Sequence, residues 1–136
     1  MTRNRLALPG LLLFCLLIAP VIDAHHSVAQ FDMVHITTVS GTVTQFEWSN
    51  PHSYIYLDVK GDNGRVVKWL TEMRSVPNLS RAGWNHSTLK PGDTIIAHGH
   101  RAKDGRAFMV IDRVELPDGR VLTNGPETLS QPAGGR

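Results

Sequence analysis

The sequence contains very little cysteine, since Cys15 is the only one in 136 residues. Cys15 lies in an N-terminal stretch that has the layout of a secretory signal, which is removed during export. Without Cys15 the chain has no thiol, so it can form neither a disulfide nor a thiolate metal site. Any metal chemistry must therefore use other side chains, and an oxidising compartment poses no difficulty.

The longest apolar stretch belongs to residues 1–24, which have the three parts of a signal peptide. A basic start with Arg3 and Arg5 precedes apolar residues 6–18, and Ala24 is a small residue that suits signal peptidase. The apolar stretch is too short to span a bilayer well. We therefore expect cleavage after Ala24, a periplasmic or secreted protein, and no stable membrane anchor after cleavage.

The remaining chain also lacks an excess of charge of either sign. Residues 1–24 contain Arg3, Arg5 and Asp23, so the 14 basic and 12 acidic residues of the whole chain fall to 12 and 11. The resulting net charge of +1 gives little support for a phosphate-binding surface. We therefore expect no nucleic-acid partner.

Familiar catalytic motifs are missing as well. The sequence has no Gly-rich phosphate loop, no HExxH pattern, and no serine, histidine and carboxylate trio with a recognisable spacing. Glu47 and His52 are close enough in sequence to form an acid-base pair, but a glutamate on a solvent-facing strand is far commoner. Catalysis is therefore the weakest of the function classes considered, and no catalytic residue is assigned.

The rest of the chain reads as a series of short strands. Alternating and β-branched segments bounded by turn residues predict strands at 39–48, 52–60, 65–71, 94–101 and 107–116, with a short extended piece at 121–122. A polar start, an early proline and a final glycine predict a helix of about two turns at 75–83.

Three strands, a short helix and two more strands follow the order of an OB-fold. We therefore predict an all-β, OB-fold-like five-stranded barrel over residues 37–123. An N-terminal segment at 25–36 precedes it, and a tail at 124–136, rich in Gly, Pro and Ser, is expected to be disordered. The alternatives are a β-sandwich and a generic small barrel, which would need further strands at regular spacing.

Several short motifs carry a resemblance to known proteins. They are AHHS at 24–27, FEWSNPH ending at His52, LKPGD from Leu89, GHRAKDG from Gly99, and LPDG from Leu116. With these motifs the chain resembles an uncharacterised family of small exported bacterial proteins, a domain of unknown function, over roughly residues 25–122. The resemblance implies an exported, single-domain β-barrel protein and brings no activity with it. It does not extend to His98, whose role depends on local pattern alone.

Five of the seven histidines are candidate metal ligands: His25, His26, His52, His98 and His100. After cleavage His25 would be the first residue, so that its α-amine and imidazole could chelate an ion together. His98 and His100 leave the same face of a predicted strand, and His52 follows the first connecting loop, which borders the usual ligand face of OB-folds. Copper heads the affinity order at nitrogen ligands, so we predict copper, with zinc less favoured.

Each of these histidines also has an ordinary structural interpretation. His25 and His26 can be an accident of processing in a loose segment. His98 and His100 can belong to the solvated face of a sheet. His52 can simply hydrogen-bond the turn that precedes it.

A binding module without metal is the alternative function. Trp48, Tyr54 and Tyr56 lie near one loop and strand, and aromatic side chains beside a barrel groove can receive an envelope protein, a peptide or a glycan. Packing in the core or across the sheet is the structural alternative, above all for Trp48.

Overall fold

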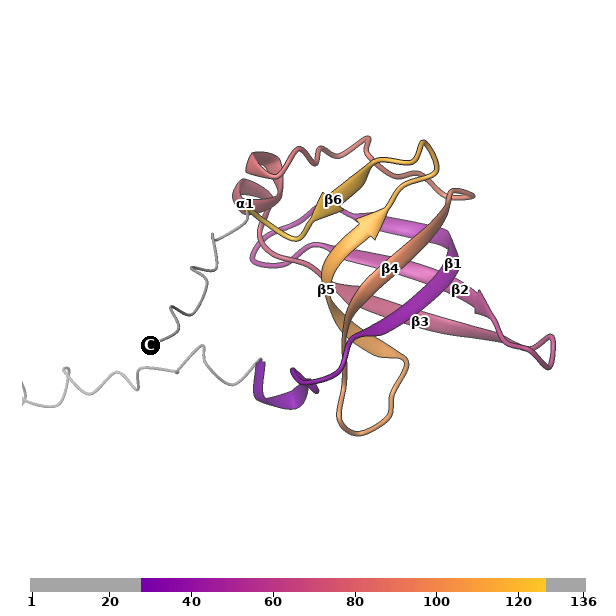
Figure 1. Cartoon of the computed structure of the whole chain (residues 1–136). Coiled ribbons are helices and arrows are strands. Elements are labelled where there is room, and N and C mark those ends of the chain that lie inside the picture. The colour runs from indigo at the N-terminus through magenta and orange to yellow at the C-terminus, as the bar shows by residue number, and fades with distance from the viewer. Residues whose placement is uncertain (1–27, 127–136) are drawn as a thin grey trace, which may run out of the picture.

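A computed structural model describes residues 28–126 of the chain (Figure 1). Its elements are a 3-10 turn η2 (Val28–Gln30), strands β1 (Thr37–Glu47), β2 (Tyr54–Lys60) and β3 (Val66–Glu72), helix α1 (Val76–Arg81), and strands β4 (Thr94–Arg101), β5 (Phe108–Glu115) and β6 (Val121–Thr123). No helix in this part of the chain is long and apolar enough to cross a membrane.

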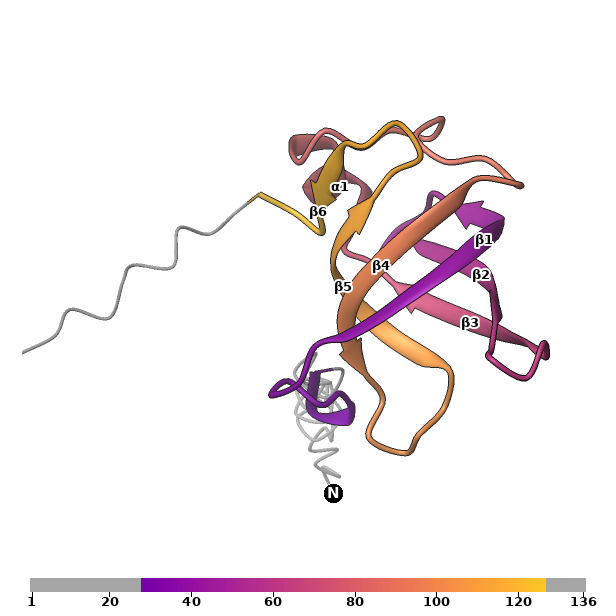
Figure 2. The ribbon, with the colours of Figure 1, turned by 45° about the vertical axis from the view of Figure 1, so that its right-hand side comes forward.

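The strands form one sheet that closes on itself (Figure 2). Their order is β3-β2-β1-β4-β5-β6, and a parallel pairing of β3 with β5 closes the barrel, where Leu70 to Glu72 lie opposite Phe108 to Val110. The other strand pairs are antiparallel. This is the strand order of an OB-fold. The predicted all-β, OB-fold-like five-stranded barrel with one short helix is confirmed.

Two strand boundaries differ from the predicted ones by two residues, and the others agree to within one residue. β1 begins at Thr37, two residues earlier than predicted, because its first residues pair with the end of β4. β2 begins at Tyr54, so His52 lies in the connection between β1 and β2 and does not open the strand. Hydrogen bonds between Ser49 and Ser53 close this connection, which fixes the place of His52 before β2 starts.

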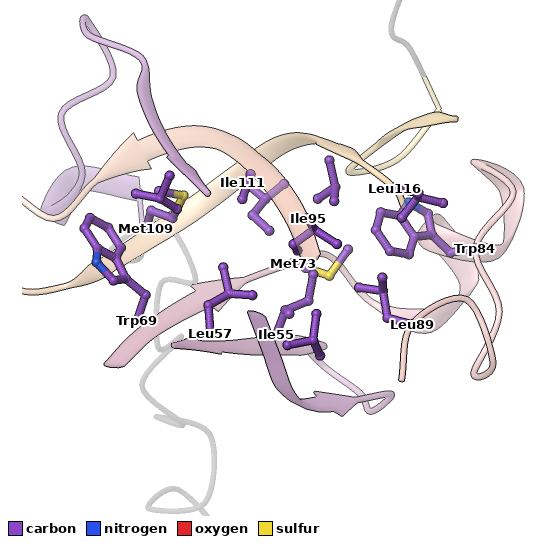
Figure 3. Close-up of a cluster of buried hydrophobic side chains, with 14 of the residues drawn as sticks. Ile55, Leu57, Trp69, Met73, Trp84, Leu89, Ile95, Met109, Ile111 and Leu116 are labelled. Atoms are coloured by element: carbon purple, nitrogen blue, oxygen red, sulfur yellow. The ribbon is translucent and has the colours of Figure 1, made fainter. Parts of the chain in front are cut away.

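The core fills the barrel and continues under the helix. The alternation along β2 places Ile55 and Leu57 inside, among the buried apolar side chains in Figure 3. At one end α1 contributes Leu79, which is fully buried, and Trp84 follows it and donates its indole N–H to the Thr123 carbonyl at 2.8 Å. Full burial of a side chain such as Leu79 stabilises the fold by roughly 1.5–3 kcal/mol.

A β-bulge at Asp112 interrupts the pairing of β5 with β4. His98 pairs with Arg113, but the following residue Gly99 pairs with Ile111, so Asp112 has no partner of its own in β4. Such bulges bend a strand and change the direction of a side chain. A Cβ on Gly99 would lie 2.1 Å from the backbone oxygen of Val110, so the backbone of β5 leaves no room for a side chain at this point.

Candidate functional site

A cleft of about 250 Å³ lies on the outer side of the barrel, beside the end of β3 and the middle of β5. The segment that precedes β1 forms part of its wall. The residues that matter for its chemistry are Phe31, Met33, His52, Glu72, Arg74 and Asp112. They combine two carboxylates, an imidazole, a guanidinium and a thioether, which is a set of groups able to bind a cation or a small polar ligand.

His52 enters this cleft with one ring nitrogen held in place. Its Nδ1 lies 3.1 Å from the carbonyl oxygen of Met73 and 3.1 Å from Oε1 of Glu72. A carbonyl oxygen can only accept, so Nδ1 carries the proton and Nε2 of the neutral ring carries the lone pair. Among residues 28–126, Nε2 has no hydrogen-bond partner, and the side chain is 41% exposed. His52 therefore bonds to residues far away in sequence and does more than hydrogen-bond its own turn.

Residues 29–36, called the strap below, run along the end of β4 and contribute Phe31 and Met33 to the wall of the cleft. Two backbone hydrogen bonds of 2.8 and 2.9 Å join the strap to residues 101–103. Phe31 is buried, and its ring centroid lies 5.1 Å from that of Phe108. The strap is thus anchored to the barrel by both backbone pairing and an aromatic contact.

Asp32 folds the strap into a turn. One of its carboxylate oxygens accepts the Val34 N–H at 3.0 Å, and the other accepts Nδ1–H of His35 at 2.8 Å. These bonds, with the side chain of His35 as the largest cause, hold the pKa of Asp32 below its ordinary value of 3.8. The turn fixes the backbone of Met33 between two hydrogen-bonded residues at the cleft wall.

His100 connects the strap to the cleft. Its Nδ1 donates to the carbonyl oxygens of Asp32 at 2.9 Å and His35 at 3.2 Å, which fixes the proton on that nitrogen. Its Nε2 lies 3.3 Å from Oδ2 of Asp112, the bulged residue of β5. In the neutral ring Nε2 therefore keeps its lone pair, and a carboxylate oxygen lies near it.

His98 has a different environment, although it lies only two residues away on the same strand. Its Nε2 donates to Oε1 of Glu115 at 2.7 Å, and Nδ1 of the neutral ring then accepts the hydroxyl of Thr38 at 2.9 Å. Both ring nitrogens of His98 are thus hydrogen-bonded. In the neutral ring the proton is on Nε2, whereas in His100 it is on Nδ1. The side chains of His98 and His100 are 11% and 10% exposed, so their interpretation as a solvated sheet face is wrong.

The structure places one of the five candidate metal ligands, His52, in the cleft. His100 does not line the cleft but lies 3.3 Å from Asp112, which does, and His98 is satisfied by its own partners. His25 and His26 lie outside the described residues. Within residues 28–126, no group of three or more His, Cys, Asp and Glu side chains is arranged to hold a metal ion. A complete metal site would therefore need a ligand of another kind or one from beyond this part.

The aromatic residues of the alternative function are divided between the core and the outer face. Trp48 packs against the core cluster, with its ring centroid 5.7 Å from that of Phe46. Tyr54 and Tyr56 are half-buried on the outward side of β2, and the hydroxyl of Tyr56 donates to Oε2 of Glu47 at 3.2 Å. Burial, together with this bond and the negative charge of Glu47, raises the pKa of Tyr56 above its ordinary value.

Sequence reasoning missed Asp112 and Glu72, the carboxylates that face the histidines. Glu72 was predicted to lie just beyond its strand. Asp112 did leave a signal, because Asp112 and Arg113 interrupt the apolar alternation that Met109 and Ile111 begin. Two polar residues in succession within a strand are consistent with a bulge.

Comparison with known proteins gives a family and no function. No curated protein matches the sequence. Residues 14–110, well over half of the chain, match the model of DUF6152, described as a family of unknown function. The resemblance found in the sequence motifs is thereby confirmed at the level of the family. This chain belongs to DUF6152, a family of unknown function.

Proposed function

We propose that this protein is an exported metal-binding barrel that takes up copper in preference to zinc, and that the cleft beside His52 and Asp112 is its binding site. The observation that carries the proposal is the contact of 3.3 Å between Nε2 of His100 and Oδ2 of Asp112. Two backbone carbonyls keep a proton on Nδ1 of His100, so Nε2 of the neutral ring has a free lone pair near the Asp112 carboxylate. A metal ion bound there would be attracted by both groups.

His52 supports the same function by a pattern common around metal-binding imidazoles. Metal-ligating histidines usually donate their second ring N–H to a carboxylate or a backbone carbonyl, which orients the ring and raises its basicity. Nδ1 of His52 meets both kinds of acceptor, in Glu72 and Met73. Its Nε2 is therefore prepared to bind an ion in the cleft.

His25 and His26 are the proposed source of the remaining nitrogens. Phe31, which lines the cleft, follows His26 by five residues, and five residues of extended chain span at most about 18 Å. Cleavage after Ala24 would give His25 a free amine beside its imidazole, and such a pair displaces its proton to bind a metal near neutral pH. Copper is preferred because nitrogen ligands bind it most tightly among the divalent first-row metals.

The experiment is a titration of the exported, processed protein with copper(II) and with zinc. Intact-mass measurement first establishes whether His25 is the first residue. We expect one bound copper(II), bound about tenfold or more weakly in His52→Gln, in Asp112→Asn and in a variant with one alanine inserted before His25. His86→Gln is the matched control, because His86 is an exposed loop residue. No copper binding, or equal affinity in all these variants, overturns the proposal.

The alternative is a metal-free binding module for an envelope protein, a peptide or a glycan. It is favoured by the register of the barrel, which places Tyr54 between Glu47 on β1 and Glu72 on β3. A tyrosine with a carboxylate on either side, on an outer barrel face, suits a polar partner. In this case Tyr54→Ala would remove partner binding, and the purified protein would contain no metal.

A further inference from the structure

We infer that the cleft binds Cu(I) as well as copper(II), with the thioether sulfur of Met33 as a ligand together with the imidazole of His52. This inference rests on the proposed function, because it concerns the same cleft and adds a second oxidation state of the same metal. It also adds a soft sulfur donor to the nitrogen and oxygen donors of the cleft.

Met33 differs from the other methionines of the described chain in where its side chain lies. Met73 and Met109 are 1% and 0% exposed and lie among the buried apolar side chains in Figure 3. Met33 is 48% exposed and lines the cleft together with His52 and Asp112. Its apolar side chain is thus kept partly in water, at the wall of the cleft, where core packing does not account for it.

The strap holds the backbone of Met33 in a fixed position. The residue before it, Asp32, donates its N–H to the Arg101 carbonyl at 2.8 Å and accepts Nδ1–H of His100 at its own carbonyl. The residue after it, Val34, donates to the Asp32 carboxylate at 3.0 Å. Because both neighbours are anchored, the backbone of Met33 stays at the cleft wall, and only rotation about its side-chain bonds moves the thioether.

The chemistry of the donors in the cleft then selects the ion. Carboxylates and amines are hard or intermediate donors, imidazole suits many transition metals, and thioethers are soft donors that favour Cu(I). Residues 28–126 contain no cysteine, so the soft donors in this part of the chain are its methionines. A methionine beside an imidazole whose other nitrogen is already hydrogen-bonded is therefore a ligand pair for Cu(I), which binds without any redox step in the protein.

Met33→Leu is the decisive variant, because leucine keeps the volume and apolar character and removes the sulfur. The processed protein would be titrated with Cu(I) under anaerobic, reducing conditions against a chromophoric Cu(I) chelator, and separately with copper(II). We expect Met33→Leu to weaken Cu(I) binding by about tenfold or more, and copper(II) binding by no more than about twofold. Met109→Leu is the matched control, because Met109 is buried and does not line the cleft.

A second measurement on the unmutated protein covers the case in which Met33→Leu folds poorly. Cu(I) is diamagnetic, so the methyl signal of Met33 stays visible by NMR and should shift on Cu(I) addition, together with the ring signals of His52. Equal Cu(I) affinity in Met33→Leu, or a Met33 signal that stays still while Cu(I) binds, overturns the inference. Copper(II) binding without Cu(I) binding overturns the inference and leaves the proposed function standing, whereas a protein that binds neither ion loses both.

Discussion

The carboxylate of Asp112 lies 3.3 Å from Nε2 of His100, although the register partner of His100 in β5 is Val110. The bulge at Asp112 makes this contact possible, because it adds a residue to β5 opposite β4. The strap carbonyls fix the tautomer of the His100 ring, and the bulge in β5 positions the Asp112 carboxylate near it. Its charge state is therefore the most informative property of the cleft to test.

Replacing Asp112 with asparagine should cost little stability in the metal-free protein. At mildly alkaline pH, where an ordinary imidazole is neutral, the amide NH2 of asparagine can donate to the Nε2 lone pair of His100 that the carboxylate only repels. We expect the free energy of unfolding to change by less than about 0.5 kcal/mol, and the copper-induced rise in Tm to disappear. Urea and thermal unfolding with and without copper measure both effects.

Glu115→Gln is the control for this experiment, because Glu115 is also a β5 carboxylate beside a β4 histidine, here His98, but lies outside the cleft. It should keep the copper-induced rise in Tm. A loss of more than about 2 kcal/mol in metal-free Asp112→Asn would instead identify a protonated His100 paired with the carboxylate, with no role for a metal.

Metal binding should also order the strap. The carbonyls of Asp32 and His35 select the His100 tautomer that leaves Nε2 facing Asp112, so metal binding and seating of the strap favour each other. We expect copper to slow hydrogen exchange at the amides of Asp32 and Lys103, which pair the strap with β4. Exchange measured by mass spectrometry tests this.

The turn end of the β2–β3 hairpin, where Asp58 to Lys60 pair with Val66 to Lys68, is the internal reference for the exchange experiment, because no residue of it lines the cleft. The slowing should persist in His98→Gln and vanish in His100→Gln. Uniform slowing across the whole barrel would mean general stabilisation and would contradict a specific coupling through His100.

Gly99 is the position where a single methyl group should do most harm. A Cβ at this residue would lie 2.1 Å from the Val110 carbonyl oxygen and 2.9 Å from the Ile111 Cα, and neither backbone atom can move without opening the sheet. Overpacking usually costs about 1–3 kcal/mol, and we expect Gly99→Ala to reach or exceed the upper end of that range. Gly61→Ala is the control, since its nearest neighbour is the end of the Asn63 side chain at 3.3 Å. Similar unfolding midpoints in urea for the two variants would contradict this prediction.

Local patterns in the sequence were enough to predict the strands, the helix and their order. The alternation from 54 to 57 separates Ile55 and Leu57 from Tyr54 and Tyr56, and the structure buries the first pair and turns the second outward, because side chains alternate along a strand. The environments of His98 and His100 could not be predicted this way. Their partners are 12 to 68 residues away and come from β1, β5 and the strap, and the bulge at Asp112 changes the register between β4 and β5.

The contact between Tyr56 and Glu47 predicts a measurable change in titration. Burial first, and then the hydrogen bond to the Glu47 carboxylate, raise the pKa of Tyr56 above 10.0 by favouring the neutral phenol in the folded state. The stability that this supplies is complete below pH 10.0, where folded and unfolded chains are both protonated. It is lost as the pH rises from 10.0 to the higher folded-state pKa, because the unfolded chain ionises first.

The chain has two tyrosines, so Tyr54→Phe leaves Tyr56 as the only source of tyrosinate absorbance. In that background Glu47→Gln should lower the pKa of Tyr56, since it removes the negative charge and weakens the acceptor of the phenol hydrogen bond. The pKa should still lie above 10.0, because burial, the largest cause, remains. Glu115→Gln, on a different strand, should leave the titration unchanged. An identical titration curve for Glu47→Gln and its parent would mean that the Tyr56 hydroxyl does not donate to Glu47 in solution, which would contradict this prediction.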